Sequence, residues 1–177
     1  MKIPNLLIIA GTGNKSGKTS MACRIIEEFP ELNITAIKIT PHFHETTDGL
    51  IATNEGDGYS IYMETNKESN KDTSRMLKAG AEKVYFAKVW DNKLPDAFYK
   101  IIEKIPEGTP VLCESPALRN FVNPGAFIIM TSDTIHNKKT INHLQDLPHL
   151  LIRLEDLTGV TSLPVTFENG KWKIKNQ

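Results

Sequence analysis

Short apolar runs alternate with amphipathic stretches along most of the chain, and this alternation predicts strands and helices in turn. Stretches with the helical spacing of apolar residues lie between strand-like runs, at 18–29, 71–81, 95–105 and 137–147. The apolar or β-branched runs that have the length of buried strands are residues 5–11, 33–40, 83–90, 109–115, 125–132 and 149–155. Strands that alternate with helices predict an α/β fold with a doubly wound, mostly parallel sheet of about six strands.

The C-terminal segment has a different pattern. Two alternating runs flank Glu168-Asn169-Gly170 and predict a β-hairpin. The chain has 177 residues and contains no internal repeat or low-complexity tract. This length suits one domain, so we expect residues 1–177 to form a single unit.

Residues 41–70 show no sustained periodicity, and a segment of this length is unusual in a compact domain unless it has a function. Its glycines and its position after the second predicted strand indicate a switch or lid that closes over a site. The run "YSIYME" (59–64) has three readings: a lid hairpin, an edge that joins two copies in a homodimer, or a hairpin folded back on its own domain.

The run "AGTGNKSGKTS" (10–20) stands between the first predicted strand and the first predicted helix. It matches the phosphate-loop pattern G-x-x-x-x-G-K-S/T except that Thr12 occupies the first glycine position. Backbone amides of such a loop, with the start of the following helix, bind phosphates; the alternative is a glycine-rich turn with an exposed lysine. The predicted nucleotide-binding residues are Gly13, Asn14, Lys15, Ser16, Gly17, Lys18, Thr19 and Ser20.

The same pattern assigns chemistry to individual residues. Lys18 reaches the β- and γ-phosphates, and the Thr19 hydroxyl binds Mg²⁺. Glu114 ends a buried strand, where a carboxylate holds Mg²⁺ or positions a nucleophile; the alternative is an ordinary strand-end carboxylate. We therefore expect Mg²⁺ at Thr19 and Glu114, a bound GTP or ATP, and catalytic roles for Lys18, Glu114 and Asp72.

Four more residues are candidates for binding a substrate: Lys38, His42, His44 and Arg75. Asp72 and Arg75 share a face at a helix start, where they contact the metal shell and an anionic substrate, or else Asp72 (or Thr73) caps the helix and Arg75 is solvated. Lys38 interrupts an apolar strand, so it either lies at an edge or reaches toward the site.

His42 and His44 follow the second strand, and in an extended chain they project to one side. They contact substrate or phosphate, or belong to a solvated loop. A zinc site would need two more ligands, for which Glu45 and Asp48 are the nearby candidates.

Composition argues against some function classes. Lys and Arg number 21, as do Asp and Glu, and this zero net charge argues against a dedicated nucleic-acid binder. Cys23 and Cys113 form no C-x-x-C pair, which is typical of reduced core cysteines in a cytosolic protein. No apolar stretch has the length of a signal-peptide core or a membrane span, so we expect a soluble, cytoplasmic protein.

The runs "GTGNKSGKT", "TAIKITPHFH", "KDTSRMLKAGAEKVYFAKV" and "VLCES" together resemble the MobB family. Members are P-loop proteins that bind GTP and serve as accessory factors in molybdenum-cofactor (molybdopterin guanine dinucleotide) synthesis. The resemblance covers about residues 5–115 and implies slow nucleotide hydrolysis and a cofactor-biosynthesis enzyme as partner. It places Lys18 and Thr19 on the phosphates and Mg²⁺, Glu114 at the strand-end acidic position, and Asp72 and Arg75 in a switch-like element. The family's glycine after the strand-end Glu is Ser115 here.

The phosphate loop also resembles that of dethiobiotin synthetase, an ATP-dependent ligase. There Lys38 would correspond to the substrate-activating lysine of the second strand, but "KDTSR…AGA" has no counterpart.

A further segment bears on which nucleotide base the protein binds. Residues 137–140, Asn-Lys-Lys-Thr, carry the first two residues of the guanine-binding motif Asn-Lys-x-Asp but end in Thr. We therefore expect no strict discrimination of GTP from ATP.

Overall fold

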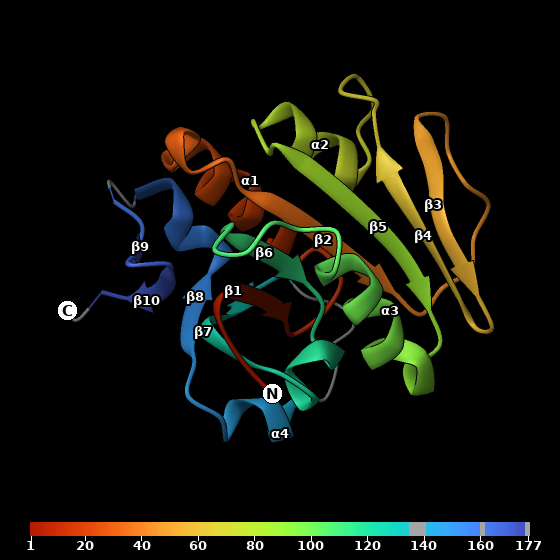
Figure 1. Ribbon diagram of the computed structural model, residues 1–177. Helices are drawn as coiled ribbons and strands as arrows, with labels where there is room; N and C mark the ends of the chain where they lie inside the picture. Colours follow the sequence, from red (N-terminus) through yellow and green to blue (C-terminus); the bar gives the residue numbers. More distant parts are fainter. Residues whose placement is uncertain (135–140, 160–161, 176–177) are drawn as a thin grey trace.

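The computed structural model describes residues 1–134, 141–159 and 162–175 and shows a mixed α/β fold (Figure 1). Its main sheet has the strand order β3-β4-β5-β2-β6-β1-β7-β8, and β9 and β10 form a separate pair. The strands are β1 (Lys2–Gly11), β2 (Thr35–Thr40), β3 (Leu50–Gly56), β4 (Tyr59–Glu64), β5 (Lys83–Val89), β6 (Val111–Glu114), β7 (Asn123–Thr131), β8 (Leu150–Arg153), β9 (Val165–Glu168) and β10 (Lys171–Ile174). The helices are α1 (Lys18–Glu28), α2 (Asp72–Lys78), α3 (Leu94–Ile102) and α4 (Asn142–Gln145), with short 3₁₀ helices η1 (Pro30–Leu32), η2 (Asp91–Lys93), η3 (Ala117–Asn120) and η4 (Leu154–Gly159).

All six strands expected from the apolar runs belong to the main sheet, and they are parallel to one another. The sheet has more strands than expected because residues 50–64 contribute two. β3 and β4 pair in antiparallel fashion, and β4 pairs with β5. "YSIYME" is β4 itself, and with β3 it forms a hairpin folded back on its own domain, with Ile61 buried in the core and β3 at the outer edge. The expectation that this run is an edge joining two copies is wrong, because β4 is paired on both sides. Most of β3 is exposed, so its sequence lacks the apolar run of a buried strand.

Two hydrophobic cores, one on each face of the sheet, explain the unbroken apolar run of β1. Leu6 and Ile8 belong to the core that includes α3, η3 and α4. Leu7 and Ile9 belong to the core that includes α1 and α2. All four side chains are fully buried, so both faces of this strand must be apolar. The helices therefore cover both faces, as in a doubly wound fold.

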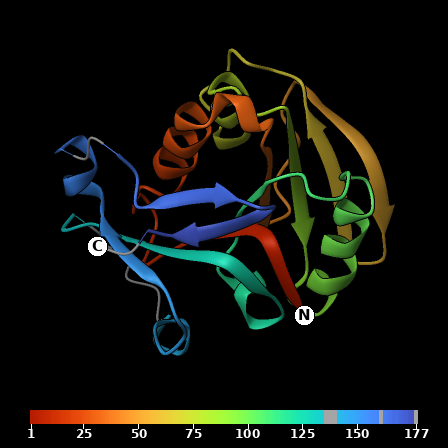
Figure 2. The same cartoon turned by 60° about the vertical axis from the view of Figure 1, so that its left-hand side comes forward.

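The C-terminal hairpin is confirmed. β9 and β10 pair in antiparallel fashion across Asn169 and Gly170, which both adopt the positive φ of a tight hairpin turn. Trp172 of this hairpin is buried against Phe29 and Phe167, so the hairpin extends the core on the α1 side. Figure 2 shows it lying across the strands beside α1.

The last helical pattern in the sequence lies partly within the described residues. Of the expected helix at 137–147, residues 137–140 lie outside the described residues, and α4 covers Asn142–Gln145. The segment 137–140 that resembles a guanine-binding motif lies outside them as well.

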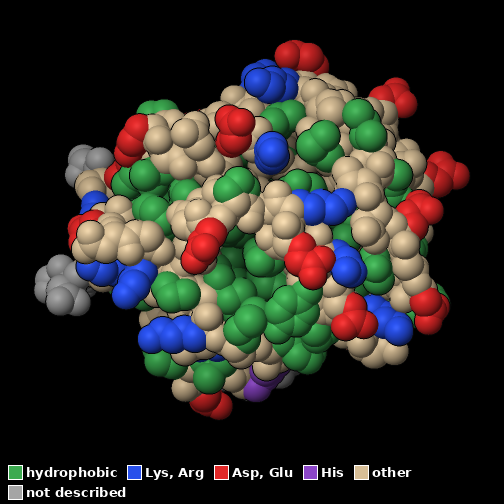
Figure 3. All heavy atoms as spheres, viewed as in Figure 1, with side chains coloured by type: hydrophobic (Ala, Val, Ile, Leu, Met, Phe, Trp, Pro, Cys, Tyr) green, Lys and Arg blue, Asp and Glu red, His purple; other side chains and the backbone are tan. Residues whose placement is uncertain are grey.

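The surface in Figure 3 shows Lys and Arg side chains interspersed with Asp and Glu, around hydrophobic side chains near the middle of that face. None of the helices in the described ranges is both long enough and apolar enough to cross a membrane.

The parallel strands β1, β6, β2 and β5 end at one edge of the sheet, where ligands bind in folds of this kind.

Candidate functional site

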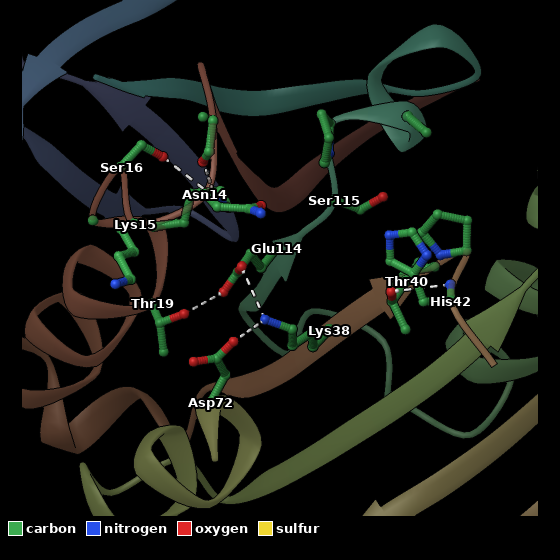
Figure 4. A pocket seen from close by; sticks show the side chains of 18 of the residues that line it. Asn14, Lys15, Ser16, Thr19, Lys38, Thr40, His42, Asp72, Glu114 and Ser115 are labelled. Carbon is green, nitrogen blue, oxygen red and sulfur yellow. Dashed lines mark hydrogen bonds and ion pairs between the residues drawn. The ribbon is translucent and has the colours of Figure 1, made fainter. Parts of the chain in front are cut away.

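A cavity of about 730 Å³ lies at the carboxyl ends of these strands (Figure 4). It brings together residues from the loop after β1, the ends of β2 and β6, and the start of α2. All the site residues predicted from the sequence line it except His44. The cavity is therefore one site rather than several separate features.

The loop between β1 and α1 is wound tightly enough to require glycine at two positions. A Cβ on Gly11 would lie 2.1 Å from the Ser16 hydroxyl oxygen, which belongs to a fully buried side chain. Gly17 has φ 89°, and a Cβ there would also lie 2.7 Å from Leu154. Lys15 also has a positive φ, of 61°. Backbone in left-handed turns of this kind forms the concave nest of amides that binds anions.

Thr12 stands where the phosphate-loop pattern has its first glycine, and the structure explains why threonine is accommodated. Its backbone N–H donates to the Met130 carbonyl at 3.0 Å, and its hydroxyl donates to Thr131 at 3.2 Å. Thr12 is not among the residues with positive φ. The side chain is thus turned toward β7, and the loop keeps its shape.

The start of α1 has the features of an anion-binding helix terminus. Its N-cap is Gly17, no side chain caps the helix, and no acidic residue occupies the first turn. The Lys18 ammonium lies over the loop and donates to the Gly13 carbonyl at 2.9 Å and to Ser16 at 3.3 Å. The helix dipole and the lysine together favour a negatively charged group at this position.

A continuous chain of charged and polar groups forms the floor of the pocket. The Thr19 hydroxyl donates to one oxygen of Glu114 at 2.9 Å, and the Lys38 ammonium donates to the other at 3.1 Å. Lys38 also pairs with Asp72. The side chain of Glu114 is 5 % exposed, that of Lys38 19 % and that of Asp72 40 %. Lys38 and Glu114 meet because they are register partners on the adjacent parallel strands β2 and β6.

This arrangement shifts the titration of Lys38 and Asp72 in opposite directions. Burial lowers the pKa of Lys38, but the carboxylates of Glu114 and Asp72 raise it by more. The net pKa of Lys38 is therefore above its ordinary value. Burial raises the pKa of Asp72, but the Lys38 ammonium outweighs it, so the net pKa is below the ordinary value. Both groups are therefore charged at neutral pH.

The lowered pKa of Asp72 predicts a pH dependence of stability. The carboxylate contributes stability that is present above its unfolded pKa of about 4 and is lost as the pH falls through its folded pKa. We expect the free energy of unfolding of the wild type to fall more steeply below about pH 4 than that of Asp72→Asn. Urea unfolding of both proteins from acid to neutral pH measures this difference. Parallel pH profiles would contradict the role assigned to the ion pair.

The structure corrects the expected capping of α2. The helix begins at Asp72, but Lys71 occupies the N-cap position and no side chain caps the helix. The Thr73 hydroxyl donates instead to Glu64 at 2.7 Å, and Asp72 contacts Lys38. Glu64 is buried at the end of β4 and also accepts the backbone N–H of Asn66 at 2.9 Å. This link positions α2, and the sequence analysis missed it because nothing local distinguishes Glu64.

The remaining predicted residues lie around the rim. Arg75 is 3.9 Å from Asp72 and donates to the Ser20 hydroxyl at 3.3 Å, so it borders the start of α1. His42 lines the pocket and is exposed. The ring of His44 stacks on His42 at 5.7 Å, while its carbonyl accepts from the buried Lys88. The structure therefore does not bring His44 to the pocket.

The described residues contain no group of three or more His, Cys, Asp or Glu side chains that could hold a metal ion. Thr19 and Glu114 supply one hydroxyl and one carboxylate. Mg²⁺ keeps several waters and binds through one or two protein groups together with substrate phosphates, so this donor set fits Mg²⁺.

Sequence reasoning missed part of the lining. Val89 ends β5 and Asp91 and Leu94 follow it, Pro116 and Ala117 follow β6, and Leu154 follows β8. The signal that would have found them is their position after parallel strands, since the carboxyl ends of these strands meet at one edge.

Comparison with known proteins adds no assignment: no family model, curated protein or solved structure matches this chain.

Proposed function

We propose that this protein has a P-loop NTPase fold, binds a nucleoside triphosphate with Mg²⁺ and hydrolyses it slowly, and that it has a MobB-like accessory role in molybdenum-cofactor synthesis in the cytoplasm. The observation that carries the proposal is the tight loop of residues 11–19 next to the Thr19–Glu114 pair. Phosphate binding needs the loop, and Mg²⁺ binding needs the hydroxyl and the carboxylate.

The groups nearest the loop have defined roles in this proposal. Backbone amides of Gly13–Thr19 hold the phosphates, and the Lys18 ammonium, now resting on the loop, turns to them. Thr19 and Glu114 would hold Mg²⁺, which neutralises charge on the β- and γ-phosphate oxygens. Lys38 orients Glu114 by occupying its second oxygen.

The same contacts support slow rather than fast turnover. Both oxygens of Glu114 already accept hydrogen bonds, from Thr19 and Lys38. Asp72 has a lowered pKa and is therefore a weak base at neutral pH. Neither carboxylate is well suited to deprotonate an attacking water, so we expect efficient turnover to need a further group or partner.

Calorimetric titration with Mg²⁺–GTP and Mg²⁺–ATP tests the binding and the base preference. We expect both nucleotides to bind, with affinities that differ by less than about a hundredfold, which corresponds to roughly 2.7 kcal/mol. The physical reason is the threonine that replaces the guanine-pairing aspartate at position 140. A larger preference for GTP would contradict the reasoning on the base, and absence of binding by either nucleotide would contradict the proposal itself.

The second candidate function is an ATP-dependent ligase that resembles dethiobiotin synthetase. It is favoured by Lys38, which the structure places in the pocket beside Glu114. Such a ligase produces stoichiometric nucleoside diphosphate only when its substrate is present. An accessory protein shows weak turnover alone and retains a cofactor-biosynthesis enzyme in a pull-down. Of the segment 41–70, residues 50–64 belong to the sheet, so residues 41–49 would act as the lid, and the outer edge of β3 would join two copies in a homodimer.

A further inference from the structure

The cavity extends beyond the phosphate loop. In Figure 4, Asn14 and Lys15 lie on one side of the pocket, Thr40 and His42 on the other, and Lys38 and Glu114 between them. We call the region on the Thr40 side the β5 compartment. Its apolar walls are Ile39, Pro41, Val89, Leu94, Pro116 and Ala117.

A nucleotide held by the phosphate loop would not extend into the β5 compartment. Thr19 contacts Glu114 on β6, and β6 lies on the β2 side of β1 in the sheet. A terminal phosphate next to a metal ion held by Thr19 and Glu114 would therefore lie toward β6 and β2. The loop holds the inner phosphates, so the nucleoside leaves in the opposite direction, toward Leu154 after β8. The compartment next to the terminal phosphate is therefore available to a second ligand.

The lining of the β5 compartment suits a molecule with an apolar body. Its polar groups are few: the hydroxyls of Thr40 and Ser115, the His42 ring and the Asp91 carboxylate. Small-molecule sites typically combine apolar walls with a few such orienting groups. Thr40 ends β2 two residues after Lys38, and Ser115 directly follows Glu114 at the end of β6, so both hydroxyls come from the strands that carry the ion pair at the floor of the pocket.

The charges of the pocket argue against an anionic head group. The lining carries one more cation than carboxylates, namely Lys15, Lys18, Lys38 and Arg75 against Asp72, Asp91 and Glu114. A triphosphate with its Mg²⁺ is itself an anion, so the loaded site has no surplus of positive charge for a second anion. A carboxylate ligand beside the terminal phosphate would be repelled, whereas a neutral hydroxyl would not.

Resting on the proposed nucleotide site, we propose that the β5 compartment binds a second small molecule, uncharged and largely apolar, whose hydroxyl group faces the terminal phosphate. The pocket would then hold two ligands at once, the nucleotide and this second molecule. The hydroxyls of Thr40 and Ser115 hydrogen-bond the head group, and the walls formed by Val89, Leu94 and Ala117 bury the body.

The test uses three probes with one apolar body: 4-fluorobenzyl alcohol, 4-fluorobenzoate and 4-fluorobenzylamine. Their binding is followed by ¹⁹F NMR, with and without Mg²⁺ and a non-hydrolysable ATP analogue. We expect the alcohol to bind the loaded protein at least about tenfold more tightly than the carboxylate. We expect Ala117→Phe, which fills the compartment, to weaken alcohol binding by at least about tenfold and to leave nucleotide affinity within about twofold in calorimetry.

Ser115→Ala is the milder variant, and it tests alcohol binding in the β5 compartment if Ala117→Phe does not fold. It should weaken binding of the alcohol several-fold. No broadening of the alcohol signal in the wild type, tighter binding of the carboxylate or the amine, or equal binding by wild type and variants would overturn the proposal. Failure of nucleotide binding alone would contradict the proposed function, and the titration without nucleotide would still decide whether the compartment binds the alcohol.

Discussion

Lys18→Ala is expected to lower the affinity for Mg²⁺–nucleotide by at least about a hundredfold, a change of roughly 2.7 kcal/mol. The ammonium lies directly over the loop, within 2.9 Å of the Gly13 carbonyl, and a charge-assisted contact to phosphate is among the stronger single interactions in a binding site. Calorimetry on both proteins measures the effect.

Lys78→Ala is the matched control for this change. Lys78 is exposed at the end of α2 and does not line the pocket, so its loss removes an equal charge without touching the phosphates. Its affinity should remain within about twofold of the wild type. Equal losses in the two variants would mean that general charge, rather than the loop geometry, attracts the nucleotide.

The second large effect concerns stability. Lys38→Met removes the cation between Glu114 and Asp72 and leaves the nearly buried Glu114 without its ion pair. Removing one partner of a buried pair typically costs 3–5 kcal/mol, and since Asp72 is 40 % exposed we expect a loss of about 2–3 kcal/mol. Urea unfolding at neutral pH measures the change.

A double variant separates charge from packing. In Lys38→Met with Glu114→Gln, the buried negative charge is gone as well, so part of the lost stability should return. If the loss of stability in the double variant equals the sum of the two single losses, Lys38 and Glu114 are not energetically coupled. That result would contradict the ion pair assigned to the floor of the pocket.

The sequence predicted the parts of the molecule that depend on local patterns. Leu6 to Ile9 form a continuous apolar run because both faces of β1 are covered, and the run therefore identified a buried strand. Gly17, Lys18 and Thr19 identified the loop because their roles depend on spacing along the chain. The turn at Asn169 and Gly170 was recognisable for the same reason.

The sequence did not predict features that depend on contacts between distant residues. β3 is an exposed edge strand that pairs with β4. Because its sequence is polar, the search for apolar runs did not identify it as a strand. Glu64 and Thr73 meet only once α2 lies against β4. The pairing of Lys38 with both carboxylates follows from the register of β2 and β6 and from the position of α2, which no local pattern encodes.

The most direct test of the account is hydrogen exchange of the full chain with and without Mg²⁺–nucleotide. Bound phosphates would occupy the backbone amides of residues 13–19, so these amides should exchange at least about tenfold more slowly in the complex. Residues 41–49, which run from β2 past His42 at the rim of the pocket, should also gain protection if they close over the site. Equal exchange of residues 13–19 in both states at saturating nucleotide would contradict the central claim that this loop binds phosphate.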